Sequence, residues 1–334
     1  EEIIKLIFGF KVKYLRQQKN FSYQELSDLT GLVVSYLHDI EKGRKYPKVD
    51  KINALASALG VDYDYLVSTQ ASKKIQPIVD LVQSDFFKAF PLELFGITPA
   101  KLFELFSTTP DKVNAFISTI TKIARNYQMK NEHFYMAALR SYQDIYDNYF
   151  EDIEQAVEKF TATFEVKPDL PLTPQYLEEL LETHYHITIN RNEIIDYAEL
   201  RQVRSYFSKS KKVLYLNKGL NRAQELFLLA RELGFQFLDL KERPYLTRIE
   251  QVDSFEQLLN NFKASYFSVA LLMPEQVLIK DIRQLAEQTS WKPQILIALL
   301  KKYEVTPEMF LQRLTNLLPH HFGINDLFFF ADER

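Results

Sequence analysis

Cysteine is absent from the 334 residues of this chain. Its absence excludes disulfide bonds, zinc sites built on thiolates and cysteine nucleophiles, and it is compatible with a reducing compartment. Long apolar runs are lacking too: no signal peptide and no membrane-spanning segment is visible, so we expect a soluble, cytoplasmic protein. Glycine and proline are scarce, with 8 and 13 residues, as is typical of a compact, mainly helical chain.

An excess of positive charge is also missing, because the formal net charge is −3. Any contact with nucleic acid must therefore come from a local basic patch. Aromatic side chains, in contrast, are abundant, with 26 Phe and 19 Tyr. Two segments carry them at helical spacing, SDFFKAFPLELFGI and RSYQDIYDNYFEDIEQAVEKF. This spacing favours packing within a helical core and between two copies of the chain; an aromatic ligand pocket is the alternative.

Residues 21–43 have the pattern of two short helices joined by a tight turn at Gly31. Ser22 followed by Glu25 is a capping box, which predicts the start of the first helix. Apolar residues recur at three- and four-residue spacing and predict one buried side for each helix. The expected buried residues are Leu26 and Leu29 in the first helix, and Val33, Leu37 and Ile40 in the second.

The polar side of this pattern suits the recognition of DNA. Exposed residues of the second helix could face a major groove, and basic clusters on both sides suit phosphate anchoring. The basic clusters are Lys11, Lys13, Arg16 and Lys19 before the motif, and Lys42, Arg44, Lys45, Lys48 and Lys51 after it. Our candidates at base edges are Val34, Ser35, Tyr36, His38 and Asp39, and at phosphates Tyr23, Gln24, Lys42, Arg44 and Lys45.

The stretch resembles the Xre family of Cro- and repressor-like DNA-binding domains. The likeness continues through EKGRKYP and the helix from Val49 to Leu59, and it implies five helices in residues 1–68. Two positions depart from the family pattern: Tyr23 stands where a Gln is common, and His38 where a Ser is frequent. Both side chains can still donate a hydrogen bond, so the resemblance implies binding to double-stranded DNA while the base sequence stays open.

Two further regions follow. The polar segment from Ser68 to Lys74 predicts a linker, and residues 69–166 are expected to form a helical middle layer through which two chains pair. A proline-rich hinge marks the start of the last region, residues 167–334. There LTPQYLEELLETHY predicts a helix, and HITIN and KVLYLN predict short strands. His184 and His186 are expected on one side of an extended segment, as metal ligands or in a structural role.

The stretch AQELFLLARELGFQFL, Ala223 to Leu238, resembles the zinc helix of the ImmA/IrrE metallopeptidase-like family. In that family the helix carries HExxH, where two histidines one turn apart hold zinc and the glutamate activates water. A second helix of the family resembles SYFSVALLMP, and its metal-binding glutamate falls at Asn261. Within the motif the glutamate is kept as Glu232, but the two histidine positions hold Arg231 and Phe235.

These replacements argue against a zinc peptidase on chemical grounds. Arginine is always charged and only donates, and phenylalanine has no lone pair. Without zinc, Glu232 has no metal-bound water to deprotonate. We therefore expect no metal, no cofactor and no catalysis, and we expect Glu232 to form an ion pair with Arg231 or with another basic residue.

An Xre-like head ahead of a metallopeptidase-like body resembles bacterial regulators that sense short-chain fatty acyl-CoA. The resemblance implies a small-molecule effector that changes how the heads bind DNA. The cysteine-rich tail of some relatives is missing here. Arg201, Arg204, Lys209, Lys211 and Lys212 are a candidate cluster for its phosphates; a solvated loop is the alternative.

The end of the chain, Asp281 to Leu318, predicts two or three helices. Burial against the body is expected from their apolar residues, and Trp291 is expected in the core. The tail DLFFF predicts a covered strand. The apolar residues are Ile295, Leu296, Ile297, Leu299 and Leu300.

The sequence thus predicts a mainly α chain with a five-helix head, a helical middle layer and a degenerate α+β, zincin-like domain. The predicted function is a dimeric, sequence-specific transcriptional regulator with a catalytically dead, ligand-sensing body. Two alternatives stay open: a protein-interaction or antitoxin-like module whose head binds DNA for autoregulation, and an active metallopeptidase.

Overall fold

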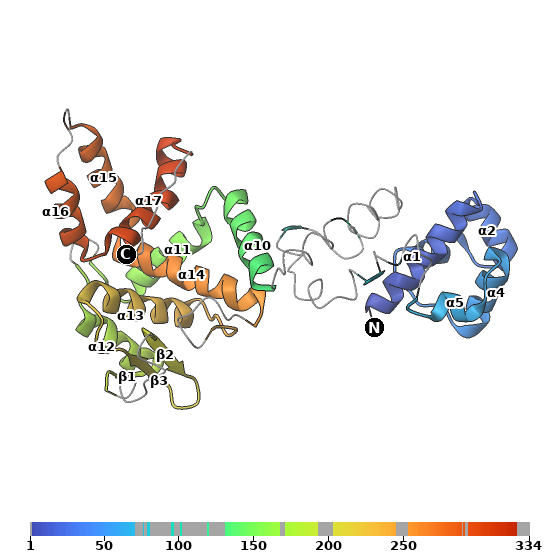
Figure 1. The fold of residues 1–334 in the computed structure, drawn as a ribbon, viewed down its shortest axis with the longest axis horizontal. Coiled ribbons are helices and arrows are strands. Elements are labelled where there is room, and N and C mark those ends of the chain that lie inside the picture. The colour runs from blue at the N-terminus through green and yellow to red at the C-terminus, as the bar shows by residue number, and fades with distance from the viewer. Residues whose placement is uncertain are drawn as a thin grey trace. The chain divides into compact units, whose positions relative to one another are not determined.

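The computed structural model describes residues 2–70, 131–167, 171–192, 203–244, 253–288 and 293–325, with a few single positions between them. The chain forms two compact units, residues 1–133 and 134–334 (Figure 1). Most of the expected middle layer, Arg201, Trp291 and the tail from Asp326 to Phe330 lie outside the described residues. The domain limits at 68 and 166 stay predictions.

Residues 2–70 form a head of five helices, as the sequence predicts. The capping box is confirmed, because Ser22 Oγ accepts from the Glu25 amide at 3.1 Å and the Ser22 amide donates to Glu25 Oε2 at 2.7 Å. Gly31 ends the first helix of the motif with φ at +68°, a conformation that suits glycine. The helices are α1 (Glu2–Gln18), α2 (Tyr23–Thr30), α3 (Val34–Glu41), α4 (Val49–Leu59) and α5 (Tyr63–Val67).

The core of the head lies between α1, α3 and α4, where Phe8, Leu37 and Leu55 are buried. Helices α1 and α3 approach closely at Gly9, where an added Cβ would lie 2.1 Å from the carbonyl oxygen of Ile40. Real Cβ atoms do not reach such distances, so only glycine permits this crossing. The crossing fixes α3 on the surface of the head.

Two apolar residues of the motif are exposed, and their predicted burial was wrong. Leu29 is 57% exposed and Val33 is 65% exposed. Val33 precedes α3 as its N-cap and has extended backbone angles, so it does not share the helical face of Leu37 and Ile40. Helix α2 has only 8 residues and buries Leu26, which leaves Leu29 at the solvent side of its last turn.

The C-terminal unit is mainly helical, with a small sheet of order β1-β3-β2 among its described residues. Strand β1 (Thr188–Asn190) runs parallel to β3 (Val213–Leu216), and β2 (Ser205–Ser208) runs antiparallel to β3. The sequence analysis did not predict strand β2; it named only the basic residues on either side of this strand. The helices are α10 (Asn131–Ile145), α11 (Glu151–Thr163), α12 (Pro174–Tyr185), α13 (Arg222–Phe237), α14 (Phe255–Leu272), α15 (Glu275–Ala286), α16 (Pro293–Tyr303) and α17 (Pro307–Phe322).

Helix α14 is the centre of this unit and packs along α13 and α11. Gly234 of α13 lies where α13 contacts α14, since an added Cβ would be 3.1 Å from the carbonyl oxygen of Ala264 on α14. A buried network ties α11, α14 and α17 together. Arg313 pairs with both oxygens of Glu154 at 2.5 and 2.9 Å, and the Tyr266 hydroxyl donates to the same carboxylate at 2.7 Å.

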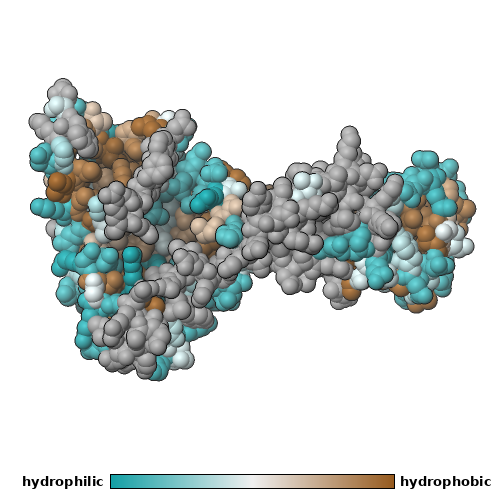
Figure 2. Space-filling view, in the orientation of Figure 1, coloured by the Kyte–Doolittle hydropathy of each residue, from teal (hydrophilic) through white to brown (hydrophobic). Residues whose placement is uncertain are grey.

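Two further expectations were wrong. His184 lies in α12 and His186 caps that helix with φ at +57°, so the two do not share an extended segment. The apolar residues of α16 are not all buried: Leu299 is, whereas Ile297 is 50% exposed. Figure 2 shows hydrophobic surface where α15 and α16 lie. Helix α16 buries only the side that carries Leu299 and Tyr303.

No helix among the described residues is long and apolar enough to cross a membrane.

Candidate nucleic-acid interface and metal-site remnant

Helix α3 is fixed to the head by a buried ion pair. Arg16 of α1 donates from Nε to Glu41 Oε1 at 2.6 Å and from Nη2 to Glu41 Oε2 at 2.9 Å. Its third donor, Nη1, reaches the carbonyl of Phe21 at 2.9 Å. Glu41 is the last residue of α3, so this pair sets where the helix ends relative to α1 and to the start of α2.

Tyr23, a candidate for phosphate contact, joins this pair. Its hydroxyl donates to Glu41 Oε2 at 2.7 Å, and its ring lies 4.1 Å from the Arg16 guanidinium. Burial, followed by the hydrogen bond to Glu41, raises the pKa of Tyr23 to about 12. Its ring also contacts His38 of α3, with centroids 5.2 Å apart. Tyr23 therefore supports α3 from behind, and its phosphate contact stays a prediction.

The base-edge candidates lie along the outer side of α3. Val34 and Ser35, in its first turn, are exposed, and Tyr36, His38 and Asp39 are partly exposed. The Tyr36 ring has two ammonium groups above it, Lys51 Nζ at 4.4 Å and Lys45 Nζ at 5.5 Å. This surface combines apolar, hydroxyl, imidazole and cationic groups within one helix and the segment after it.

Asp39 is held by two of the phosphate candidates. Its carboxylate lies 3.1 Å from Lys45 Nζ and 3.7 Å from Arg44 Nη1, and both backbone amides donate to the Asp39 carbonyl. These pairs are solvent-exposed and therefore weak, so the cations can exchange Asp39 for a phosphate. Lys42 caps the C-terminus of α3, and exposed Gln24 donates to Asp28 at 2.9 Å.

Two members of the expected basic cluster are not at the surface. Arg16 is buried in its pair with Glu41, and Lys11 is fully buried. Lys11 Nζ donates to the carbonyls of Tyr65 and Ser68, each at 2.6 Å, and so binds the C-terminal end of α5. Burial lowers the pKa of Lys11 to about 8. Phosphate anchoring by Lys11 and Arg16 was a wrong expectation, because the fold uses both inside the head.

In the C-terminal unit the residues aligned with a zinc motif lie on two packed helices. Arg231, Glu232 and Phe235 belong to α13, and Asn261 is buried on α14. Glu232 is 2% exposed and does not pair with its neighbour Arg231. Its partner is Arg243, which donates from Nη1 to Oε1 at 2.8 Å and from Nη2 to Oε2 at 2.5 Å.

The side chain of Arg243 lies beside the residues of α13 that align with the zinc motif. Its guanidinium lies 3.8 Å from the ring of Phe235 and 4.4 Å from the ring of Phe207 on β2. The sequence analysis missed this residue because LKERP has the composition of a polar loop. Only the position of β2 shows that Arg243 is enclosed between two aromatic rings.

These residues do not fit a metal ion. A guanidinium carries a fixed positive charge and offers no lone pair, and here it occupies both oxygens of the only motif carboxylate. Arg231 donates to Ser205 Oγ at 3.2 Å, and Phe235 packs on Arg243. In the described part of the chain no group of three or more His, Asp or Glu side chains could hold a metal.

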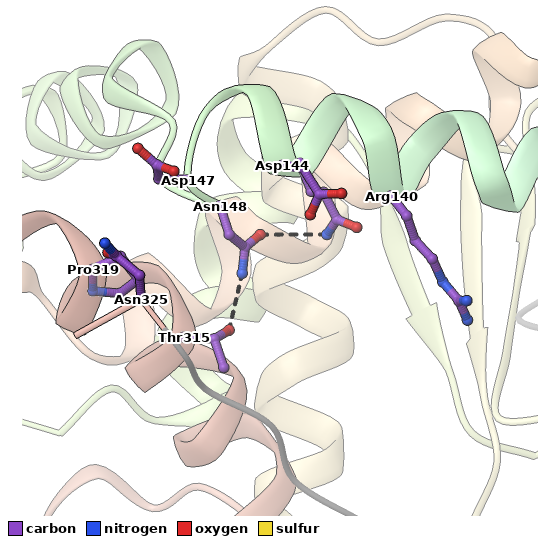
Figure 3. A pocket seen from close by; sticks show the side chains of 8 residues that line it. Arg140, Asp144, Asp147, Asn148, Thr315, Pro319 and Asn325 are labelled. Atoms are coloured by element: carbon purple, nitrogen blue, oxygen red, sulfur yellow. Dashed lines mark hydrogen bonds between the residues drawn. The ribbon is translucent and has the colours of Figure 1, made fainter. Parts of the chain in front are cut away.

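A polar pocket of about 520 Å³ lies elsewhere in this unit, beside the turn between α10 and α11. Asn148 crosses it, donating to Thr315 Oγ1 at 2.9 Å and accepting from Gln143 at 3.4 Å (Figure 3). Its lining also includes Arg140, Asp144, Asp147, Pro319 and Asn325. The candidate phosphate cluster is made of other residues: exposed Arg204 directly precedes β2, and exposed Lys209, Lys211 and Lys212 lie in the turn from β2 to β3.

Comparison with known families supports both halves of this description. Residues 12–66 match the helix-turn-helix family, and residues 187–315 match the family described as IrrE N-terminal-like domain. The control protein C.BamHI of Bacillus amyloliquefaciens is 39% identical over 59 residues, which cover 17% of this chain and 73% of that protein.

Two more relatives resemble about the same length of chain. The uncharacterized HTH-type transcriptional regulator y4dJ of Sinorhizobium fredii is 34% identical over 62 residues, 19% of this chain and 80% of the relative. The immunity repressor protein of Bacillus phage phi105 is 31% identical over 62 residues, 19% of this chain, and the chain spans only 43% of that repressor. The chain belongs to the Xre-type helix-turn-helix family of transcriptional regulators, and it carries an IrrE N-terminal-like domain C-terminal to that head.

Proposed function

We propose that this protein is a sequence-specific, dimeric DNA-binding regulator of transcription that reads the major groove with α3. The observation that carries the proposal is the fixed presentation of α3. Its inner end is bound to α1 by Arg16 and Glu41, while Val34 and Ser35 are exposed at its first turn. Residues at the start of a reading helix are those that contact base edges.

The exposed groups of α3 have the chemistry that base edges require. Val34 can pack on a thymine methyl group, Ser35 and His38 can exchange hydrogen bonds with several bases, and Asp39 can accept from the amino group of cytosine. Lys42, Arg44 and Lys45 follow directly and can neutralise phosphates on either side of the groove. A regulator uses such a combination of positioning cations and reading side chains.

We propose further that the IrrE-like domain is catalytically inactive and senses a small molecule. The pairing of Glu232 with Arg243 supports inactivity, because this carboxylate is committed to a guanidinium instead of a metal-bound water. An acyl-CoA-like effector is the candidate ligand, with Arg204, Lys209, Lys211 and Lys212 as candidate contacts for its phosphates. Dimerisation through residues 69–166 completes the proposal and would match a symmetric operator.

The first test is a selection of binding sites from random DNA by the purified protein. We expect a palindrome with half-sites about one or more helical turns apart. The control is the double variant Ser35→Ala/His38→Ala, which keeps the buried core of the head and should lose the enrichment. If a dimer neutralises about eight phosphates, log affinity should fall with log salt at a slope near −7.

A slope near zero, or no enriched sequence at low salt, would contradict DNA reading and favour the interaction or antitoxin-like module. That alternative predicts a stable complex with a protein partner. Isothermal titration with acetyl-CoA and propionyl-CoA tests the effector, and the absence of heat at high protein concentration would reject an acyl-CoA ligand.

A further inference from the structure

Arg231 is an arginine without an acidic partner in the described part of the chain. It stands where a zinc helix carries its first histidine, on the same helix as the paired Glu232. Of its five N–H groups, one has a hydrogen-bond acceptor: Nη2 donates to Ser205 Oγ at 3.2 Å. Its other close contact is weak, since the ring of Phe227 lies 5.9 Å away.

The charges around Arg231 do not compensate it. Glu232 follows Arg231 directly in the sequence, but Arg243 already holds both oxygens of its carboxylate. Burial, followed by the positive charge of Arg243, lowers the pKa of Arg231 to about 10; Glu232 raises it and Arg204 lowers it by smaller amounts. Arg204 itself is exposed and directly precedes β2. Its positive charge also acts on the carboxylate of Glu308, at the start of α17.

A partly buried guanidinium with no counter-charge among the described residues is unfavourable in the folded chain. The same arrangement is favourable once an oxyanion binds, because charge-assisted hydrogen bonds then use the free donors. Arg231 keeps part of its surface exposed, so an anion can reach it from solvent.

We propose that Arg231, with the positive charge of Arg204 near it, is a binding site for the phosphate group of a small molecule. The former metal helix would thus have inverted its charge preference, from a cation held by histidines to an anion held by arginines. Phosphate fits better than a carboxylate because Arg204 adds positive charge near Arg231 and phosphate offers both more charge and more acceptors. The proposal deepens the effector-sensing part of the proposed function and is independent of DNA binding.

Thermal unfolding of the full chain tests the site with inorganic phosphate as the probe. Scanning calorimetry follows the unfolding, and chloride and acetate at equal ionic strength serve as reference anions. We expect 10 mM phosphate to raise the unfolding temperature by about 2–4 °C, as for a ligand bound at about millimolar affinity. Equal shifts with chloride or acetate would overturn the proposal.

The variant Arg231→Met separates an anion site from a structural role. It should abolish the phosphate shift and, without phosphate, unfold at the same or a higher temperature than the native chain, because an uncompensated charge is removed. Arg222→Met is the matched control on the same helix, since Arg222 is exposed and pairs with Glu304 at 2.6 Å. It should keep the phosphate shift.

A phosphate shift that survives Arg231→Met contradicts the proposal, and so does its loss in Arg222→Met. If Arg231→Met does not fold, Arg231→Lys replaces it; this variant keeps the charge but loses the planar donors, and it should bind phosphate about tenfold more weakly. A positive phosphate result with failed DNA selection would reject the regulator and keep the anion site. The reverse outcome would reject only the anion site.

Discussion

The head and the IrrE-like domain each hold a bidentate arginine–glutamate pair against an aromatic ring. In the head, Arg16 binds Glu41 and lies 4.1 Å from the ring of Tyr23. In the C-terminal unit, Arg243 binds Glu232 and lies 3.8 Å from the ring of Phe235. Both guanidiniums are nearly inaccessible to solvent. The Arg16 pair joins α1 to α3, and the Arg243 pair joins the segment after α13 to that helix.

The surroundings of the two pairs differ. Every nitrogen of the Arg16 guanidinium has an acceptor, and Glu41 gains a further donor from Tyr23. Arg243 keeps a buried Nε without an acceptor among the described residues. The pair of the head is a complete support for an exposed helix. The pair of the C-terminal unit lies among the residues aligned with a zinc motif, and there the guanidinium holds the motif carboxylate.

The largest expected effect comes from breaking the two pairs one at a time. Arg16→Met leaves Glu41 buried without a counter-charge and should destabilise the head by about 3–5 kcal/mol, with a similar cost for Arg243→Met in the other unit. Hydrogen exchange of peptides from α3 and α13 measures each effect. DNA affinity should fall in Arg16→Met alone. Loss of affinity in Arg243→Met as well would show that the two units are coupled.

Restoring the zinc ligands tests whether Arg243 closes the C-terminal site. The triple variant Arg231→His/Phe235→His/Asn261→Glu recreates the family pattern but keeps Arg243 beside Glu232. Zinc should not bind it at micromolar concentration, because a fixed positive charge lies at the site. Adding Arg243→Ala should raise zinc affinity at least about a hundredfold, roughly 2.7 kcal/mol. Competition with a zinc-binding dye measures both, and equal affinities would show that Arg243 is no obstacle.

The pH dependence of the head tests the buried ammonium group of Lys11. Its pKa falls from 10.5 to about 8 in the folded chain. Between these values the unfolded chain binds the extra proton, so stability should rise with pH by up to about 2 kcal/mol. Below pH 8 both states are protonated and this contribution is flat. Unfolding of the native chain and of Lys11→Met across pH 7–10 should differ in slope, and parallel curves would contradict the lowered pKa of Lys11.

The smallest effect is a gain in stability at the N-cap of α3. Val33 occupies this position and makes no side-chain hydrogen bond to the helix. Val33→Ser supplies the missing acceptor and removes an exposed apolar group, so the head should become more stable by about 1 kcal/mol. Chemical denaturation monitored by circular dichroism measures the gain, with Val33→Ala as the control that removes the apolar group alone. An unchanged midpoint for both variants would show that the cap is satisfied by solvent.

The sequence determined the local features of both units. The capping box of Ser22 and Glu25, the turn at Gly31 and the starts of the helices depend on groups a few residues apart. The loss of the metal ligands could be read in the same way, because HExxH places its residues on one helix face. Short-range spacing is sufficient for such features, since backbone geometry fixes which side chains meet.

The tertiary structure alone decided which charges pair and which apolar groups are covered. Arg16 and Glu41 are 25 residues apart and Arg313 and Glu154 are 159 apart, so no spacing rule connects them. Arg243 pairs with Glu232 because β2 and α13 enclose the Arg243 side chain. This pairing leaves Arg231 without a carboxylate partner among the described residues. Helix crossings set these contacts, and the crossings depend on packing across the whole unit.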